Sequence, residues 1–302
     1  MEKIQIAATG HSLNYLPEYL AVANGYFAEE GIELNAIVPS PWDKVITEIE
    51  QSTSNYALGG IWVPAMYHGN GKQLVPFAQL AARCPMVIVG RKEEQFQFEN
   101  LIDKTILVPG GNGASPGMFL EQLLKEHDID QAQVKMARCL SGAMMKELFV
   151  GGLGDYLLID PISALKLSRE TDNVIVTHLS QTGGAVPWSV YYCTPETLGA
   201  DEEFQVKFSR ALDKGMQFVN EHPAEEISEL LAKLFPANEL DDLITLVNAY
   251  REWGMRTSPE IDRPSCERWL QAIADGNLSA QPIPYEELVN HKIAARALNQ
   301  TA

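Results

Sequence analysis

Cysteine is scarce in this sequence, and the four cysteines lie far apart. Cys84, Cys139, Cys193 and Cys266 form no Cys-x-x-Cys pair, and the six histidines are equally dispersed. Zinc sites need close and regular spacing of such residues, and disulfides are the less favoured alternative for cysteines so scattered. We therefore expect no metal site, and we interpret the cysteines as reduced, buried thiols that behave as small apolar side chains.

Basic residues are also few. The 302 residues include 23 Lys and Arg against 40 Asp and Glu, which gives a formal net charge of −17. Nucleic acids and anionic membranes are bound by clustered Lys and Arg that contact phosphate groups. The charge balance therefore argues against a nucleic-acid partner and favours solubility.

Long apolar runs are missing. The sequence has no stretch of about 18 apolar residues free of charge and proline, so we expect no membrane insertion. The first six residues, Met-Glu-Lys-Ile-Gln-Ile, resemble a polar lead into a strand and lack the regions of an export signal. We expect a cytoplasmic protein if Met1 is the native start, and a periplasmic one if a signal peptide has been removed.

Apolar residues make up 46% of the chain, enough for two lobes with separate cores. Short apolar runs alternate with helical periodicity, which predicts doubly wound α/β sheets. In the first lobe we expect strands at 4–8, 34–38, 56–60 and 75–80 and helices at 15–27 and 43–51. In the second we expect strands at 105–108, 134–139, 156–160 and 174–178 and helices at 116–127 and 144–150.

Two extended apolar segments, 86–91 and 187–193, are predicted to cross between the lobes as a hinge. Helical periodicity then dominates, at 201–221, 224–234, 239–253 and 265–275. A tail so rich in helices is expected to pack on the first lobe. The predicted division is therefore a discontinuous lobe 1, residues 1–88 plus 190–302, and a lobe 2 of residues 89–189.

Two sequence blocks point to a known family. Residues 15–34 contain an apolar helix, then Gly25-Tyr26-Phe27, then Gly31 and an apolar-acidic-apolar strand. They resemble the first helix and second strand of the nitrate/sulfonate/taurine and thiamine-pyrimidine binding-protein group. Residues 104–117 are similar to the strand, glycine-rich loop and helix start of that group's second lobe. The resemblance extends roughly over residues 4–193.

The resemblance implies a periplasmic-binding-protein type 2 fold, with two doubly wound mixed sheets joined by two crossing strands. It also implies a function. Such a protein binds one small organic molecule, either a flat ring or a small organic anion, in the cleft between its lobes. It would act as an ABC-transporter substrate-binding protein with a transporter permease as partner, or as a cytoplasmic relative. The same fold is also used by a few enzymes, so the fold alone does not give function.

Candidate binding residues follow the first three strands, because ligands of doubly wound sheets bind beyond the carboxyl ends of the strands. The first loop supplies His11, Ser12, Asn14 and Tyr15, although Ser12 or Asn14 could instead cap the helix. The later loops supply Trp42, Gly60 and Trp62. Two tryptophans could form aromatic walls for a flat ring, or could fill the core.

The glycine-rich loop at 110–115 is a candidate for binding an anion or a polarised oxygen. Its residues Gly111, Asn112, Gly113 and Ser115 precede a helix whose first N–H groups lack partners. The loop fits no dinucleotide fingerprint and has no Walker lysine, which argues against a nucleotide. An ordinary turn is the alternative.

Four further candidates lie at strand ends or in a crossing segment: Arg83, Ser141, Asp160 and Trp188. Arg83 could hold a carboxylate or sulfonate with two hydrogen bonds, or could form a surface ion pair. Asp160 could bind an amine, although an Asp before a proline also commonly caps a helix.

The sequence departs from the enzymes of this fold. The fungal pyrimidine synthases have a cysteine cluster near the second crossing, where this chain has only Cys193, and the desulfinase-like enzymes need a cysteine in the first loop, where it has Ser12. No cofactor motif replaces them, so we expect a binding protein without a cofactor. The alternative is a small cleft enzyme of the decarboxylase, desulfinase or pyrimidine-synthase type, with His11 as the proton-transfer residue.

Overall fold

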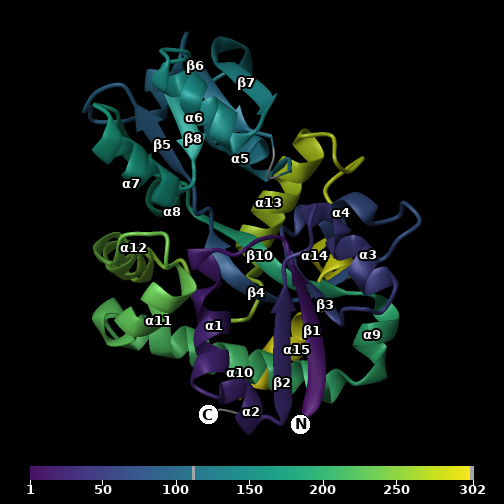
Figure 1. The fold of residues 1–302 in the computed structure, drawn as a ribbon. Coiled ribbons are helices and arrows are strands. Elements are labelled where there is room, and N and C mark those ends of the chain that lie inside the picture. The colour runs from purple at the N-terminus through teal and green to yellow at the C-terminus, as the bar shows by residue number, and fades with distance from the viewer. Residues whose placement is uncertain (111–112, 300–302) are drawn as a thin grey trace. The chain divides into compact units, whose positions relative to one another are not determined.

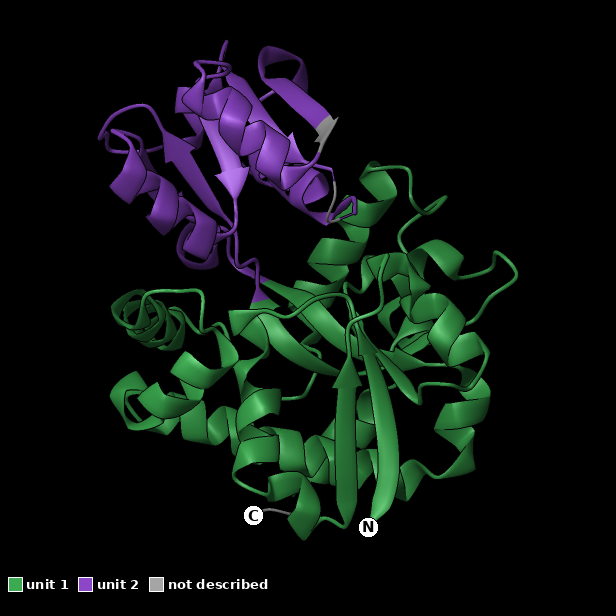
Figure 2. Cartoon of the chain, viewed as in Figure 1, with its two compact units in different colours: residues 1–82, 186–302 green, residues 83–185 purple. Residues whose placement is uncertain are grey.

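A computed structural model describes residues 1–110 and 113–299, and the chain forms two compact units (Figure 2). Unit 1 contains Met1–Ala82 and Val186–Ala302, and unit 2 contains Arg83–Ala185. The chain passes from one unit to the other at 82/83 and at 185/186, where the sequence predicts 88/89 and 189/190.

Unit 1 is built on a five-stranded mixed sheet with the order β2-β1-β3-β10-β4 (Figure 1). β1 is parallel to β2 and to β3, whereas β10 is antiparallel to β3. Ile4 and Ile6 of β1 are buried within this sheet's core. The strands are β1 (Glu2–Ala8), β2 (Ile32–Ile37), β3 (Tyr56–Gly59), β4 (Val75–Arg83) and β10 (Ala185–Cys193).

The helices of unit 1 come from both ends of the chain. The α-helices are α1 (Leu16–Ala23), α2 (Tyr26–Glu29), α3 (Val45–Glu50), α4 (Trp62–Tyr67), α9 (Pro195–Ala200), α10 (Glu202–Glu221), α11 (Ser228–Leu234), α12 (Leu240–Glu252), α13 (Arg263–Asp275), α14 (Tyr285–Leu288) and α15 (His291–Asn299). The 3₁₀ helices are η1 (Leu13–Tyr15), η2 (Trp42–Lys44) and η5 (Ala224–Ile227). The predicted helix at 15–27 is divided into α1 and α2, because Gly25 takes a left-handed conformation with φ +78°.

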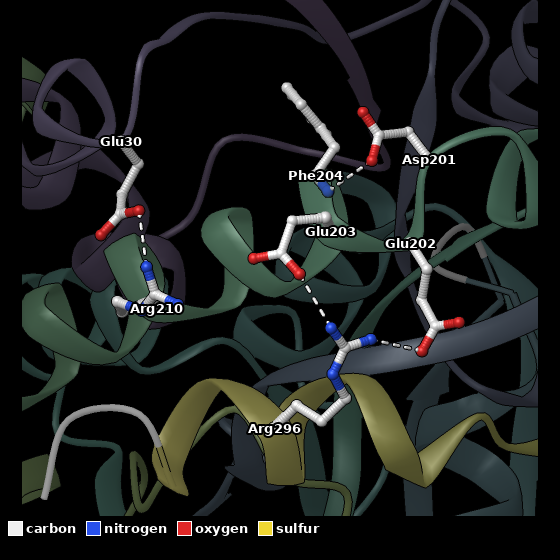
Figure 3. A network of polar contacts seen from close by, with 7 residues as sticks. All are labelled: Glu30, Asp201, Glu202, Glu203, Phe204, Arg210 and Arg296. Carbon is white, nitrogen blue, oxygen red and sulfur yellow. Dashed lines mark hydrogen bonds and ion pairs between the residues drawn. The ribbon is translucent and has the colours of Figure 1, made fainter.

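The long helix α10 joins the C-terminal part of the chain to the first helices. Phe208, Leu212 and Met216 lie on its buried face, and the helix packs against both α1 and α15. Asp201 caps its first turn by accepting a hydrogen bond from the Phe204 N–H at 3.0 Å. Arg296 of α15 forms ion pairs with two consecutive glutamates of α10, as Figure 3 shows. The predicted packing of the helical tail on the first lobe is thereby confirmed, while α14 and α15 were not predicted.

We expect Gly215→Ala to destabilise unit 1, because α10 and α1 approach each other closely at this glycine. A Cβ atom there would collide with the backbone oxygen of Pro17 and lie 3.1 Å from the Ala21 Cβ. The helices would have to separate, at a cost of about 1–3 kcal/mol in the free energy of unfolding. Urea titration measures this. Gly199→Ala in α9 is the matched control, since among the described residues nothing apart from its chain neighbours and its own helix backbone lies within 4 Å of its Cβ position. Equal stabilities of the two variants would refute the expectation.

Unit 2 contains a second five-stranded mixed sheet, with the order β7-β6-β8-β5-β9. Its strands are β5 (Val87–Gly90), β6 (Thr105–Pro109), β7 (Lys135–Leu140), β8 (Tyr156–Ile159) and β9 (Val174–His178). Its helices are α5 (Ser115–Glu126), α6 (Gly142–Val150), α7 (Pro161–Glu170), α8 (Leu179–Thr182), η3 (Phe98–Leu101) and η4 (Gln131–Gln133). β6 is parallel to β7 and β8, whereas β5 is antiparallel to β8 and β9.

The two segments predicted as hinge strands are members of different sheets. β5, within the segment 86–91, pairs with β8 and β9 inside unit 2. β10, which includes the segment 187–193, pairs with β3 inside unit 1. Their apolar character reflects burial within a sheet, since all four residues of β5 and the last five of β10 are buried. Across 1–110 and 113–299, none of the helices has both the length and the apolar character that a membrane crossing needs.

Candidate functional site

The sheet of unit 1 has a switch point between β1 and β3. Tyr191 and Trp188 are three positions apart on β10, so their side chains point to opposite faces of the sheet. Tyr191 donates a hydrogen bond to Glu18 of α1 at 2.6 Å. Trp188 stacks on Trp269 of α13, with ring centroids 6.1 Å apart, and α13 packs against α4. The chain therefore continues from β1 into a helix on one face of the sheet, and from β3 into a helix on the other face. Where the connections of two neighbouring strands go to opposite faces in this way, a ligand crevice opens at the carboxyl ends of the strands.

The loop after β1 brings polar groups to this switch point. The Ser12 hydroxyl donates to the side-chain oxygen of Asn14, and the Asn14 amide donates to the Ser189 hydroxyl at 3.4 Å. The hydroxyls of Thr9 and Tyr15 lie 3.3 Å apart. Asn14 and Tyr15 are buried, so these polar groups provide hydrogen-bond partners for one another beneath the protein surface. Ser12 precedes η1, but its side chain makes no capping bond to a backbone N–H.

His11 anchors the same loop. Its ring lies 5.0 Å from the ring of Tyr19 and 4.6 Å from that of Phe235, centroid to centroid. Its Nε2 lies 2.9 Å from the backbone oxygen of Leu234. A carbonyl oxygen only accepts hydrogen bonds, so Nε2 carries the proton and donates. Any proton transfer by His11 would therefore have to use Nδ1.

The structure brings together two of the three predicted tryptophans. Trp42 in η2 and Trp62 at the start of α4 meet edge to face, with centroids 6.3 Å apart and an interplanar angle of 68°. Both indoles are partly exposed, in contrast to a core pair. Trp188 is also partly exposed and belongs to the Trp269 stack on α13.

A fully buried tyrosine beside this loop was not identified from the sequence. A Cβ on Gly59 would lie 2.7 Å from the Thr9 methyl group and 3.5 Å from the Tyr192 hydroxyl, so β1, β3 and β10 converge there. The Tyr192 hydroxyl is buried and has no hydrogen-bond partner in the described part of the chain. Burial raises the pKa of Tyr192, so the hydroxyl stays protonated and can donate. The predicted site residue Gly60 follows directly and is partly exposed.

The glycine-rich loop of unit 2 is described only in part. Gly111 and Asn112 lie outside the described residues. Gly113 has φ +74°, and Ser115 is the first residue of α5 and is buried. Anion binding at this loop stays a prediction.

The remaining predicted residues of unit 2 have structural partners. The side chain of Ser141 caps α6 by accepting from the Met144 N–H at 3.3 Å. Asp160 caps α7 by accepting from the Ser163 N–H at 2.9 Å, which is the alternative that the Asp-Pro sequence suggested. Arg83 donates from Nη1 to the backbone oxygen of Ser180 at 3.2 Å.

The three cysteines whose side chains the structure describes are poor candidates for nucleophilic catalysis. Cys84, Cys193 and Cys266 are buried and form no disulfide. Burial raises the pKa of Cys84, and raises those of Cys193 and Cys266 to about 12. A thiol of high pKa is a weak nucleophile at neutral pH. The side chain of Cys139 is not described. Within the described ranges, no group of three or more His, Cys, Asp or Glu is arranged to hold a metal ion.

Comparison with known proteins agrees with the resemblance noted above. The model of the family described as NMT1/THI5 like matches residues 12–226. YtlA of Bacillus subtilis strain 168, named as a candidate binding protein, is 28% identical over 309 residues, covering 99% of this chain and 91% of YtlA.

Solved structures share the fold. The periplasmic aliphatic sulphonate binding protein SsuA of Escherichia coli matches with a TM-score of 0.73 at 11% identity, covering 98% of this chain and 99% of SsuA. The desulfurization enzyme DszB matches with a TM-score of 0.69 at 13% identity over the whole of both chains. The predicted periplasmic-binding-protein type of fold is therefore confirmed, and because the family model matches most of its length, the chain belongs to the NMT1/THI5-like family.

Proposed function

We propose that this chain binds one small organic molecule, a flat ring or a small organic anion, at the carboxyl ends of β1 and β3. The observation that supports this most directly is the buried Tyr192 hydroxyl, which has no hydrogen-bond partner among the residues that the structure describes. The hydroxyl lies 3.5 Å from the position that a Cβ on Gly59 would take, and the Thr9 methyl group lies 2.7 Å from the same position. Thr9 begins the polar loop that contains Asn14 and Tyr15. The partly exposed pair of Trp42 and Trp62 follows the neighbouring strands and would supply an aromatic wall.

Binding is favoured over catalysis by the chemistry of these groups. Hydroxyls, an amide and indoles complement a ground-state ligand, whereas catalysis needs groups that favour a transition state. His11 uses Nε2 to hold the backbone of Leu234. The three cysteines of known environment are buried thiols of raised pKa, which argues against a DszB-like reaction at a cysteine.

A role as the substrate-binding component of an ABC-type importer fits this proposal. YtlA is named as a candidate binding protein, and SsuA as a periplasmic binding protein for aliphatic sulphonates. In that role the chain would deliver its ligand to a membrane-embedded permease and would act outside the cytoplasm. In unit 2, Arg83, Gly113, Ser115, Ser141 and Asp160 stay candidates for further ligand contacts.

We expect a panel of pyrimidines, aromatic carboxylates and sulfonates to contain ligands that raise the melting temperature. A ligand that binds only the folded state, at a hundred times its dissociation constant, stabilises by about 2.7 kcal/mol. Differential scanning fluorimetry measures the shift. If only metal ions or nucleotides shift the transition, the proposed ligand class is wrong.

A pair of hydroxyl deletions tests where the ligand binds. Tyr15→Phe removes the hydroxyl that lies 3.3 Å from the Thr9 hydroxyl, and should weaken ligand binding about fivefold to tenfold. Tyr26→Phe is the matched control, because its hydroxyl accepts a hydrogen bond from Asn24 at the far end of α1. Calorimetric titration compares the two, and equal affinities would argue against a site at the end of β1.

A further inference from the structure

One arginine of unit 1 is buried with no counter-charge in the described part of the chain. The Arg256 side chain is fully enclosed, with 2% of the residue exposed. Nη2 donates to the backbone oxygen of Leu13 at 2.8 Å, while Nε and Nη1 have no hydrogen-bond partner within 1–110 and 113–299. Its guanidinium carbon lies 5.4 Å from the centroid of the Tyr250 ring. Within the described residues it forms no ion pair.

The backbone around Arg256 is held on the sheet. The N–H of Ala82 in β4 donates to the Met255 oxygen at 2.8 Å, and the Asn220 amide of α10 donates to the Arg256 oxygen at 2.9 Å. The arginine is therefore fixed from two sides. Its one side-chain hydrogen bond reaches η1, the turn that contains Asn14 and Tyr15.

Burying a guanidinium without an anion is costly, since the charge loses its hydration and gains no partner. Burial lowers the pKa of Arg256 to about 10, which still leaves the group protonated at neutral pH. A positive charge therefore persists beneath the first loop. In a poorly polarisable interior its field is only weakly screened.

We propose that Arg256 is a positioning residue that holds η1 in place and makes the site at the end of β1 selective for anions. This inference rests on the proposed function and names the charge of its ligand. A carboxylate or sulfonate bound beside η1 would supply the counter-charge that the protein does not. A neutral molecule of the same shape would gain from the placement of η1 but nothing from the charge of Arg256.

The test compares ligands that differ in charge but hardly in shape. The probes are benzenesulfonate against benzenesulfonamide, and benzoate against benzamide, titrated calorimetrically at pH 7. Wild-type protein should bind the anion of each pair at least tenfold more tightly. Arg256→Met should remove most of that preference: losing the hydrogen bond to Leu13 should weaken both probes, and losing the charge should weaken the anion at least fivefold further than the neutral probe. Arg256→Lys, which keeps the charge, should keep the preference.

The possible failures are distinguishable. Equal binding of anion and neutral probe by wild-type protein would overturn this inference and leave the proposed function standing. A parallel loss of both affinities in Arg256→Met would also overturn it, because a purely structural role weakens both equally. Binding of none of the four probes by wild-type protein would overturn the inference together with the aromatic-anion form of the proposed function. Circular dichroism establishes that each variant is folded, and the wild-type comparison does not depend on any variant.

Discussion

Glu18→Gln is expected to abolish most of the pH dependence of unit 1 stability between about pH 4.5 and pH 7. Glu18 lies in α1 and is almost completely buried, with 1% of the residue exposed. Burial raises the pKa of Glu18 to about 7, and the hydrogen bond from Tyr191 opposes this rise only in part. The carboxyl group therefore prefers to be neutral in the folded protein.

The direction of the pH effect follows from proton binding. An unfolded glutamate ionises near pH 4.5, whereas Glu18 in the folded protein holds its proton to about pH 7. Between these values the folded state binds more protons, so the free energy of unfolding falls as the pH rises. The loss amounts to about 3 kcal/mol. Glutamine cannot ionise, so Glu18→Gln should not show this loss. Between pH 4.5 and pH 8, its free energy of unfolding should therefore rise relative to that of the wild type by about that amount.

Urea denaturation of both proteins at a series of pH values measures this. Tyr191→Phe provides an independent arm, because it removes the hydrogen bond that favours the charged carboxylate. That variant should lose more stability in total than the wild type does, because the loss continues to a higher pH. Parallel pH profiles for wild type and Glu18→Gln would refute the assignment.

Arg91→Met is expected to lower the free energy of unfolding of unit 2 by about 2–4 kcal/mol. The guanidinium of Arg91 donates hydrogen bonds to backbone oxygens at the C-terminal end of α6 and in the turn that follows. Nη1 donates to Phe149 at 2.6 Å, and Nη2 donates to Leu153 at 2.9 Å and to Gly154 at 2.8 Å. The guanidinium carbon also lies 3.7 Å from the centroid of the Phe149 ring. Removing it takes away these donors from the oxygens of Leu153 and Gly154 in the turn after α6, and leaves the Phe149 oxygen with the Gly152 N–H alone.

Hydrogen exchange at residues 149–155, together with urea denaturation, measures the effect. Arg91→Lys is the matched control: it keeps the charge but cannot reach three oxygens at once, so an intermediate loss is expected. Faster exchange should be confined to the end of α6 and the turn that follows. Unchanged stability in Arg91→Met would mean that water replaces these hydrogen bonds at no cost.

The candidate site could be predicted only where its residues follow strands in sequence. The loop containing Asn14 and Tyr15 was identified because it comes directly after an apolar strand, and the Trp42 and Trp62 pair for the same reason. Arg256 could not be found this way, since its hydrogen bond to Leu13 connects residues 243 positions apart. Tyr192 was missed because, in sequence, it is one aromatic residue of an apolar strand.

The sequence by itself determined the α/β class, the order of most strands and helices, and the resemblance to a binding-protein family. The class and the order of elements follow from local periodicity, which reports how often a side chain faces a core. The resemblance rests instead on the residues of the two blocks 15–34 and 104–117. Only the tertiary structure decided that the segments 86–91 and 187–193 belong to separate sheets, and that Glu18, Tyr192 and Arg256 are buried. Strand pairing and the burial of polar groups depend on contacts between distant parts of the chain, such as Asn14 with Ser189, 175 positions apart. No local pattern encodes such contacts.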